Sequence, residues 1–248
     1  ATARECEVMG EVTGDVLLAY PPVGAARLAR LMSLPTDVRL TVAVDSAESI
    51  EALAEAARAA DGGGGREVGV YVEMDVGMRR VGVPGVDDAI ALARLVRARA
   101  PLRWDGVTFY PGHVREPIDE QGPSLARLGR DLDGALARFR AAGLEPRVVS
   151  GGSTPAAWRM HEVSAVTEVR PGTYVYNDRT TAAIGACAWD DCALTVLATV
   201  VSTAVPGQAV VDAGTKALGR EPVRGAEGEG WGALVDRPGV VVSRMREQ

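Results

Sequence analysis

Short apolar runs alternate along the chain with longer segments whose apolar residues recur at helical spacing. Continuous apolar runs of about five residues are typical of strands buried on both faces of a parallel sheet. The segment 122–142 instead places leucines on one face of an amphipathic helix. The predicted strands are 16–20, 40–44, 68–74, 106–110, 147–149 and 167–170, and the predicted helices are 25–32, 47–60, 87–99 and 122–142.

This alternation predicts an α/β fold with a parallel sheet. Each predicted strand ends in a polar or glycine-rich loop, as in a (β/α)8-type barrel, although an open doubly wound sheet would give a similar pattern. From about residue 190 the pattern changes to strands without intervening helices, at 193–201, 209–212 and 239–243. We expect a barrel over residues 1–185 and a small β domain over 186–248. Both are expected to be partial, because six barrel strands are found where a closed barrel has eight.

Composition and charge narrow the class of protein. Hydrophobic residues make up 47% of the 248 residues, which is enough for a sizeable core and excludes a wholly disordered chain. The net charge of -6 disfavours nucleic-acid binding, and no apolar run is long enough for a membrane span. Cys6, Cys187 and Cys192 are too scattered for a disulfide framework or a zinc site. We therefore expect free thiols, no metal site in this chain and a cytoplasmic location.

Two loops at strand ends have the composition of an anion site. Ser150–Thr154 reads Ser-Gly-Gly-Ser-Thr, and Arg170–Asp178 begins Arg-Pro-Gly-Thr. Backbone N–H groups and hydroxyls at such junctions bind phosphate, and the loops after the last barrel strands commonly share one phosphate site. A plain turn explains either loop alone, but the two together favour a phosphorylated cofactor or substrate. The chain has neither a Walker lysine nor a GxGxxG spacing, which argues against nucleotides.

Three further residues are candidates for chemistry. Arg80 follows the strand 68–74 and could contact an anionic or phenolic oxygen of a ligand, although an Asp75–arginine pair that braces the loop explains the segment equally well. His113 also follows a strand and could exchange protons or contact a ligand ring, whereas a lone histidine is more often structural. Lys216 is the only lysine and thus the only side chain able to form a Schiff base. Because it lies in the predicted β domain, we interpret it as a structural or inter-subunit residue.

Several segments, taken in chain order, resemble the family of D-threonine aldolase and D-serine dehydratase. These are pyridoxal-phosphate enzymes of the alanine racemase fold, and the resemblance covers nearly the whole chain. The segments that carry it are Ala19–Gly24, Val72–Gly82, Tyr110–His113, Ser150–Thr154, Glu168–Asp178, Asp212–Leu218 and Val241–Arg244. The implied fold is a barrel of the alanine racemase kind, lacking its first strand, followed by a small, incomplete β domain.

The resemblance also implies a set of cofactor contacts. Arg80 would lie near the ring of pyridoxal phosphate, and His113 at the mouth of the barrel. The residues implied around the phosphate are Gly152, Ser153, Thr154, Gly172, Thr173, Tyr174 and Tyr176. In the family, the Schiff-base lysine lies upstream of the position of Ala1, and the ligands of a divalent metal lie beyond the position of Gln248. We therefore expect no catalytic lysine in this chain, part of a longer enzyme or a truncated one, and little or no activity.

The first functional hypothesis is a pyridoxal-phosphate-dependent lyase that acts on D-3-hydroxyamino acids. It would cleave D-threonine to glycine and acetaldehyde, or dehydrate and deaminate D-serine, and the family fold implies a homodimer when complete. A non-catalytic or degenerate pyridoxal-phosphate-binding barrel is the second hypothesis. A racemase of the same fold is the third, and it would need a catalytic tyrosine from the β domain, where none follows Tyr176.

Overall fold

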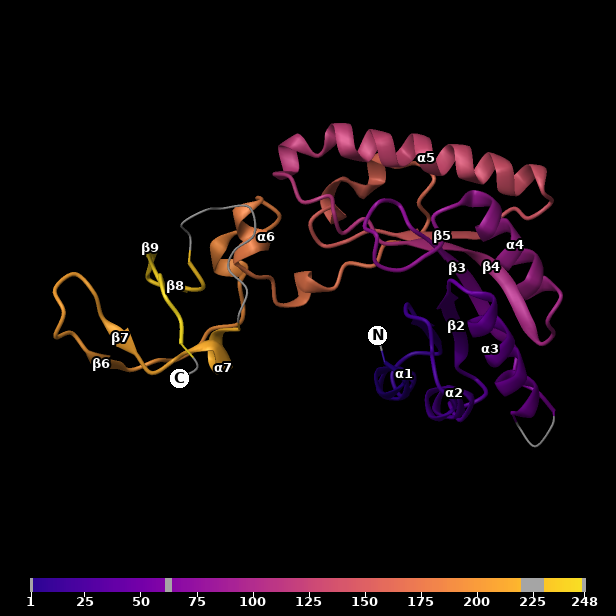
Figure 1. The fold of residues 1–248 in the computed structure, drawn as a ribbon, viewed down its shortest axis with the longest axis horizontal. Helices are drawn as coiled ribbons and strands as arrows, with labels where there is room; N and C mark the ends of the chain where they lie inside the picture. Colours follow the sequence, from indigo (N-terminus) through magenta and orange to yellow (C-terminus); the bar gives the residue numbers. More distant parts are fainter. Residues whose placement is uncertain (1, 61–63, 220–229, 247–248) are drawn as a thin grey trace. The chain divides into compact units, whose positions relative to one another are not determined.

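The computed structural model describes residues 2–60, 64–219 and 230–246 (Figure 1). The chain divides into two compact units, Ala1–Pro171 and Gly172–Gln248. The sequence-based boundary between residues 185 and 186 stays a prediction.

The first unit is built on a five-stranded parallel sheet. Its strands follow one another in chain order from β1 to β5. The predicted segment 167–170 contributes a single parallel bridge, between Ser150 and Glu168, rather than a sixth full strand. The strands are β1 Asp15–Leu18, β2 Arg39–Val44, β3 Val68–Met74, β4 Leu102–Phe109 and β5 Val148–Gly151. This arrangement confirms the predicted α/β class and a partial barrel sheet.

Helices in the first unit connect the strands, as the sequence predicts. They are α1 Ala3–Gly10, α2 Ala25–Met32, α3 Ala47–Ala59, α4 Val86–Arg97 and α5 Gly122–Ala141, with the short 3-10 helices η2 Ile118–Glu120 and η3 Ala157–Glu162. Ser46 caps α3, because its hydroxyl accepts a hydrogen bond from the backbone of Ser49. The helix α1 was not predicted. It begins with a capping box between Thr2 and Glu5 and buries only Ala3 and Cys6, so its apolar pattern is weak.

The two faces of the sheet differ in polarity. Alternate residues of a strand point to opposite faces, and Val68, Val70 and Val72 belong to clusters of apolar side chains shared with helices α2 to α5. The residues between them, Tyr71 and Glu73, point to the other face, which we call the inner face, and both are buried. The helix-covered face therefore supplies the apolar core, while the inner face carries polar groups.

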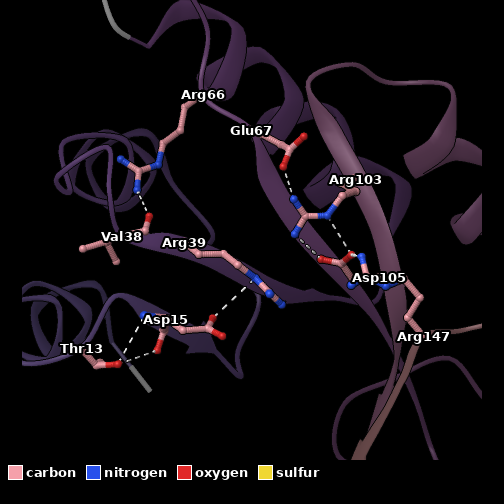
Figure 2. Close-up of polar contacts among 9 residues, drawn as sticks. All are labelled: Thr13, Asp15, Val38, Arg39, Arg66, Glu67, Arg103, Asp105 and Arg147. Carbon is pink, nitrogen blue, oxygen red and sulfur yellow. Dashed lines mark hydrogen bonds and ion pairs between the residues drawn. The ribbon is translucent and has the colours of Figure 1, made fainter.

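Charged residues hold the amino-terminal edge of the sheet together (Figure 2). The buried carboxylate of Asp105 accepts hydrogen bonds from Arg103 at 2.8 and 2.7 Å and lies 3.4 Å from the Arg147 guanidinium. The buried guanidinium of Arg66 donates to carbonyls of the turn before β2, among them Val38 at 2.6 Å. In barrel enzymes this end of the strands serves stability, so we look for chemistry at the opposite edge.

The second unit contains two small antiparallel pairs of strands, which confirms a small β-containing part. The pairs are β6 Val200–Ser202 with β7 Val210–Val211, and β8 Ala233–Leu234 with β9 Arg237–Val241. The predicted strands at 193–201, 209–212 and 239–243 are thus shorter or shifted. The unit also contains helices that the sequence did not predict, namely α6 Arg179–Ala183, α7 Thr215–Leu218, η4 Thr173–Val175 and η5 Trp189–Asp191. None of the helices described in either unit is long and apolar enough to cross a membrane.

Candidate active site at the carboxyl edge of the sheet

The loops after β3, β4 and β5 leave the same edge of the sheet. Carboxyl ends of parallel strands share one edge, where ligands of such folds usually bind. The loop after β3 carries Arg80, the loop after β4 carries His113, and the loop after β5 carries Gly152–Thr154. The first unit therefore gathers three of the predicted contact groups at one edge.

Asp75 braces the loop after β3 through the backbone. Its carboxylate accepts hydrogen bonds from the N–H groups of Gly77 at 2.9 Å and Arg79 at 3.0 Å. Burial acts to raise the pKa of Asp75, but these backbone hydrogen bonds outweigh it and hold the pKa below its usual value. Among the described contacts Asp75 makes no ion pair with an arginine side chain, so the bracing pair considered from the sequence is replaced by a backbone cap. Arg80 contacts the ring of Tyr110 instead.

Arg80 and His113 each contact the neighbouring loop, where the loops after β3 and β4 come together. The Arg80 guanidinium lies over the ring of Tyr110, 4.6 Å from the ring centroid. The His113 ring lies against Gly77, because a Cβ atom there would be 3.4 Å from Cε1 of the imidazole. Both Arg80 and His113 are exposed, and Arg80, Tyr110 and Glu73 are among the residues that line a small depression. A cation, a phenol ring and an imidazole are thus available to a ligand at this edge.

A row of polar side chains crosses the inner face just below these loops. Glu73 on β3 pairs in register with Thr108 on β4, Thr108 pairs with Ser150 on β5, and Ser150 pairs with Glu168. We call these four residues the polar row. Arg170 closes it, since its guanidinium donates to Oγ of Ser150 at 2.9 Å and to Oγ1 of Thr108 at 2.8 Å. Ser150 in turn donates to the carboxylate of Glu168.

Burial and charge oppose each other in this row. Burial raises the pKa of Glu73, and the nearby guanidinium groups of Arg170 and Arg80 oppose that rise. Burial likewise lowers the pKa of Arg170, against the attraction of Glu73 and Glu168. Burial, together with the charges of Glu168 and Asp105, also raises the pKa of Tyr71 to about 12. The inner face is therefore a set of charges and dipoles held in a fixed geometry, suited to orienting a polar ligand.

The loop after β5 approaches the sheet closely because two glycines open it. A Cβ atom on Gly151 would overlap the Phe109 ring, and Gly152 has a φ of +122°, which side chains other than glycine rarely adopt. Ser153 follows with 2% exposure. Its hydroxyl is buried and has no hydrogen-bond partner among the described residues. Among the described residues, the buried hydroxyls of Ser153 and Thr41 lack a hydrogen-bond partner, and of these two only Ser153 lies in a loop at the carboxyl edge of the sheet, where a ligand or water can satisfy it.

The remaining predicted cofactor contacts lie in the second unit. Gly172, Thr173, Tyr174 and Tyr176 are all exposed there, around the short helix η4. That these four residues surround the same phosphate group as Ser153 stays a prediction. Lys216 lies in α7, in the same unit. No group of three His, Cys, Asp or Glu residues within the described ranges is arranged to hold a metal ion.

Sequence reasoning placed Ser150 and Arg170 at the start of the two predicted anion loops but did not name them as ligand contacts. It did not assign Glu73, Thr108 and Glu168 to the site, although they lie on the same face. One signal was present, because Glu73 is a charged residue at an alternate position of an otherwise apolar strand. The register that places Thr108 and Ser150 beside it is a property of the paired strands and is not visible in any one segment.

Residues 9–180 match the family of the alanine racemase N-terminal domain, and residues 193–248 match a serine dehydratase domain family. The first match extends over more than half of the chain. The chain belongs to the alanine racemase N-terminal domain family. The predicted resemblance and the predicted alanine racemase-type fold are thereby confirmed.

Proteins of known activity are similar to this family member along most of its length. D-threo-3-hydroxyaspartate dehydratase of Delftia sp. (strain HT23) is 37% identical, over 98% of this chain and 64% of that protein. D-threonine aldolase of Arthrobacter sp. is 30% identical, over 92% of this chain and 61% of that protein. The solved structure of the Delftia dehydratase superposes with a TM-score of 0.83 at 33% identity, covering 100% of this chain and 67% of that one. The chain thus spans less than two thirds of the length of these two curated relatives.

Proposed function

We propose that the protein is a pyridoxal-phosphate-dependent lyase that acts on D-3-hydroxyamino acids. The similar proteins are aldolases and dehydratases whose names specify 3-hydroxy-D-aspartate or D-threonine. The observation that carries the proposal is the buried, unpartnered hydroxyl of Ser153 at the end of β5. It lies on the loop that the family resemblance assigns to the cofactor phosphate.

The residues at this edge fit the cofactor. A phosphate group accepts hydrogen bonds, and the hydroxyl of Ser153 is a donor with no other described partner. Gly152 leaves the backbone open beside it. The guanidinium of Arg80 and the imidazole of His113 stand in the neighbouring loops, where they can contact the ring and its substituents. Bound pyridoxal phosphate supplies an electron sink for the bond that breaks at the substrate α-carbon.

The protein's own residues have four tasks in this proposal. Ser153 and the loop around it hold the phosphate and fix the register of the cofactor. Arg80 stabilises negative charge at the mouth, where its position over Tyr110 limits its freedom. Arg170 and Glu73 orient the ring from the inner face, because the hydrogen bonds of Arg170 to Ser150 and Thr108 hold its guanidinium in place. A position on the same edge also lets His113 exchange protons with a substrate.

A direct assay tests the reaction class. The whole protein is supplied with pyridoxal phosphate, a divalent metal and D-threonine or 3-hydroxy-D-aspartate, with the L-enantiomers as controls. An aldolase releases glycine and an aldehyde, whereas a dehydratase releases ammonia and a 2-oxo acid. When the protein assayed includes the lysine that the family links to pyridoxal phosphate, we expect one of these two product sets, and from D-substrates only. Racemised amino acid as the main product would contradict the proposal and favour the racemase hypothesis.

A second assay tests the place of Lys216. The protein is mixed with pyridoxal phosphate and reduced with borohydride, and the labelled peptides are mapped by mass. We expect no saturable label at Lys216, because it belongs to α7 of the second unit, whereas the strands that carry the site belong to the first unit. A saturable label there would assign the cofactor linkage to the second unit.

The remaining expectations are proposals of the same kind. We infer that a small D-amino acid is the substrate, that the complete enzyme is a homodimer, and that it works in the cytoplasm. Size-exclusion chromatography with light scattering, and fractionation of the source cells, test the last two.

A further inference from the structure

Gln121 connects the two loops that carry His113 and Ser153. It lies between η2 and α5, and its side chain is fully buried with 0% exposure. The amide nitrogen Nε2 donates to the carbonyl of Glu116 at 3.0 Å and to the carbonyl of Pro155 at 2.9 Å. Glu116 belongs to the loop after β4, and Pro155 directly follows the segment Gly152–Thr154. One buried amide group therefore ties the two loops to each other.

Glu116, whose carbonyl accepts one of the hydrogen bonds from Gln121, is itself held in place by further hydrogen bonds. The Glu116 carboxylate accepts hydrogen bonds from the hydroxyl of Ser124 and from the backbone N–H of Arg115. The Arg115 side chain donates to the carbonyl of Gly112, beside His113, at 2.6 Å. Glu116 is thus held to its own loop and to the start of α5, so that its carbonyl is a rigid partner for Gln121.

The loop after β5 receives the second hydrogen bond of Gln121, at the Pro155 carbonyl. It closes a turn in which the Ala157 N–H donates to the Thr154 carbonyl at 3.2 Å. The Pro155 carbonyl points out of this turn to Gln121, which limits how the backbone from residue 153 to 156 can rotate. The buried hydroxyl of Ser153, two residues before Pro155, has no described partner of its own to hold it in place.

We propose that Gln121 is a positioning residue that sets the Ser153–Thr154 segment for a phosphate group. The inference rests on the proposed function and deepens it. According to this inference, the affinity for a phosphate group depends on the buried side-chain amide of Gln121, which lies just before α5. Loss of the two donors frees the Pro155 carbonyl, so the segment samples other conformations and the phosphate contact weakens.

Two variants separate positioning from general stability. Gln121→Met keeps the approximate size of the side chain and removes both donors. Arg159→Met is the matched control, because the Arg159 guanidinium joins η3 to η2, the 3-10 helix just before Gln121, by donating to the Ile118 carbonyl at 2.8 Å. Its described hydrogen bonds go to Ile118, Asp119 and Glu162, and none goes to the Ser153–Pro155 segment.

The readout is the affinity of the whole protein for pyridoxal phosphate and for pyridoxal, measured by calorimetric titration. The ratio of the two affinities isolates the phosphate contribution from the ring contribution. In Gln121→Met we expect this ratio to fall about tenfold with the affinity for pyridoxal unchanged. Arg159→Met should retain the wild-type ratio. Equal weakening toward both ligands, or an unchanged ratio in Gln121→Met, overturns the inference.

Two further measurements keep the test decisive. If Gln121→Met does not fold, Gln121→Asn replaces it, since it retains an amide on a side chain too short to reach both carbonyls. Adding Ser153→Ala to either variant should cost less phosphate affinity than it does in the wild type, because both changes remove the same contact. Additive losses would overturn the inference. A wild-type protein that binds pyridoxal phosphate no better than pyridoxal would instead contradict the proposed function itself.

Discussion

Ser153 and Glu73 are both buried polar residues, but their surroundings differ. The Ser153 hydroxyl has no partner among the described residues, whereas the Glu73 carboxyl lies near the positive charges of Arg170 and Arg80. A hydroxyl without a partner costs free energy in the folded protein until a ligand or water satisfies it. Burial of a carboxyl costs more free energy in its ionised form than in its neutral form. The two residues therefore respond to different changes.

Ser153→Ala should make the cofactor-free protein more stable. Removing a buried, unpaired hydroxyl is expected to raise the free energy of unfolding by about 1 kcal/mol, while the affinity for pyridoxal phosphate falls. Denaturant unfolding and calorimetric titration measure the two effects. Ser124→Ala is the matched control, because the Ser124 hydroxyl donates to Glu116 and its loss should be destabilising. Equal destabilisation by both changes would mean that Ser153 already has a partner.

Glu73→Gln should change how stability depends on pH. The pKa of Glu73 in the folded protein lies above its usual value of 4.5, so its favourable contribution is complete below that pH and is lost as the pH rises through the folded pKa. Glutamine does not ionise, so the variant should gain stability relative to the wild type between acidic and neutral pH. The gain is about 1.4 kcal/mol for each unit by which burial raises the pKa. Unfolding curves at several pH values measure this difference. If the wild type is instead the more stable protein at neutral pH, the attraction of Arg170 and Arg80 outweighs the effect of burial on Glu73.

At the scale of elements, the strand that ends at Gly151 sets the site by close packing. Strand β5 can approach β4 only because residue 151 has no side chain at the point where it meets the Phe109 ring. The helix α5 on the outer surface also contains a glycine, Gly134, which is exposed and has open space around it. The same substitution at the two positions therefore has opposite expected effects.

Gly151→Ala should destabilise the protein by about 2 kcal/mol or more, because the new methyl group overlaps the Phe109 ring in a packed core. Gly134→Ala should stabilise it by about 1 kcal/mol, because alanine is the better helix former at an exposed position. Thermal unfolding of the two variants measures both. Similar effects of the two changes would contradict the packing assigned to β5.

Some elements could be predicted from local pattern, and others could not. The helix 25–32 and the strand 68–74 have the predicted bounds, because their apolar periodicity is strong. The helix α1 escaped prediction since its stability comes from its cap and few of its residues are buried. Arg80, His113 and Ser153 lie in loops at one edge of the sheet, as their positions after predicted strands indicate, whereas their contact with a cofactor stays a prediction. The polar row was missed because Glu73, Thr108 and Ser150 become neighbours only through the register of three strands.

At the scale of the whole chain, the two units differ in how much they bury. In the first unit, almost all side chains of strands β2, β3 and β4 are buried. In the second unit, β6 and β9 are largely exposed, and the described buried apolar side chains include only Ile184 and Ala186. Backbone amides exchange with solvent according to the free energy of the opening that exposes them. The two units should therefore exchange on different timescales.

Hydrogen exchange followed by mass spectrometry should find the slowest amides in β2, β3 and β4. Amides of β6 and β9 should exchange faster by orders of magnitude, because little buried apolar surface opposes their opening. Cofactor should slow exchange in the loop after β5 more than in β2. Protection of β9 equal to that of β3 would contradict a weakly packed second unit.

The alternation of β3 has a consequence for how such a protein can change over evolution. Its outward residues, Val68, Val70 and Val72, pack with the helices, while Gly69, Tyr71 and Glu73 face inward. Alternate residues of one strand thus contact the helices and the inner face separately. A substitution at Tyr71 or Glu73 leaves the helix contacts of Val68, Val70 and Val72 in place, whereas Gly69 cannot be replaced in the same way, because a Cβ atom there would overlap the carboxylate of Asp105. Evolution can therefore alter the inner face of this strand by single substitutions while the helix-covered core stays unchanged.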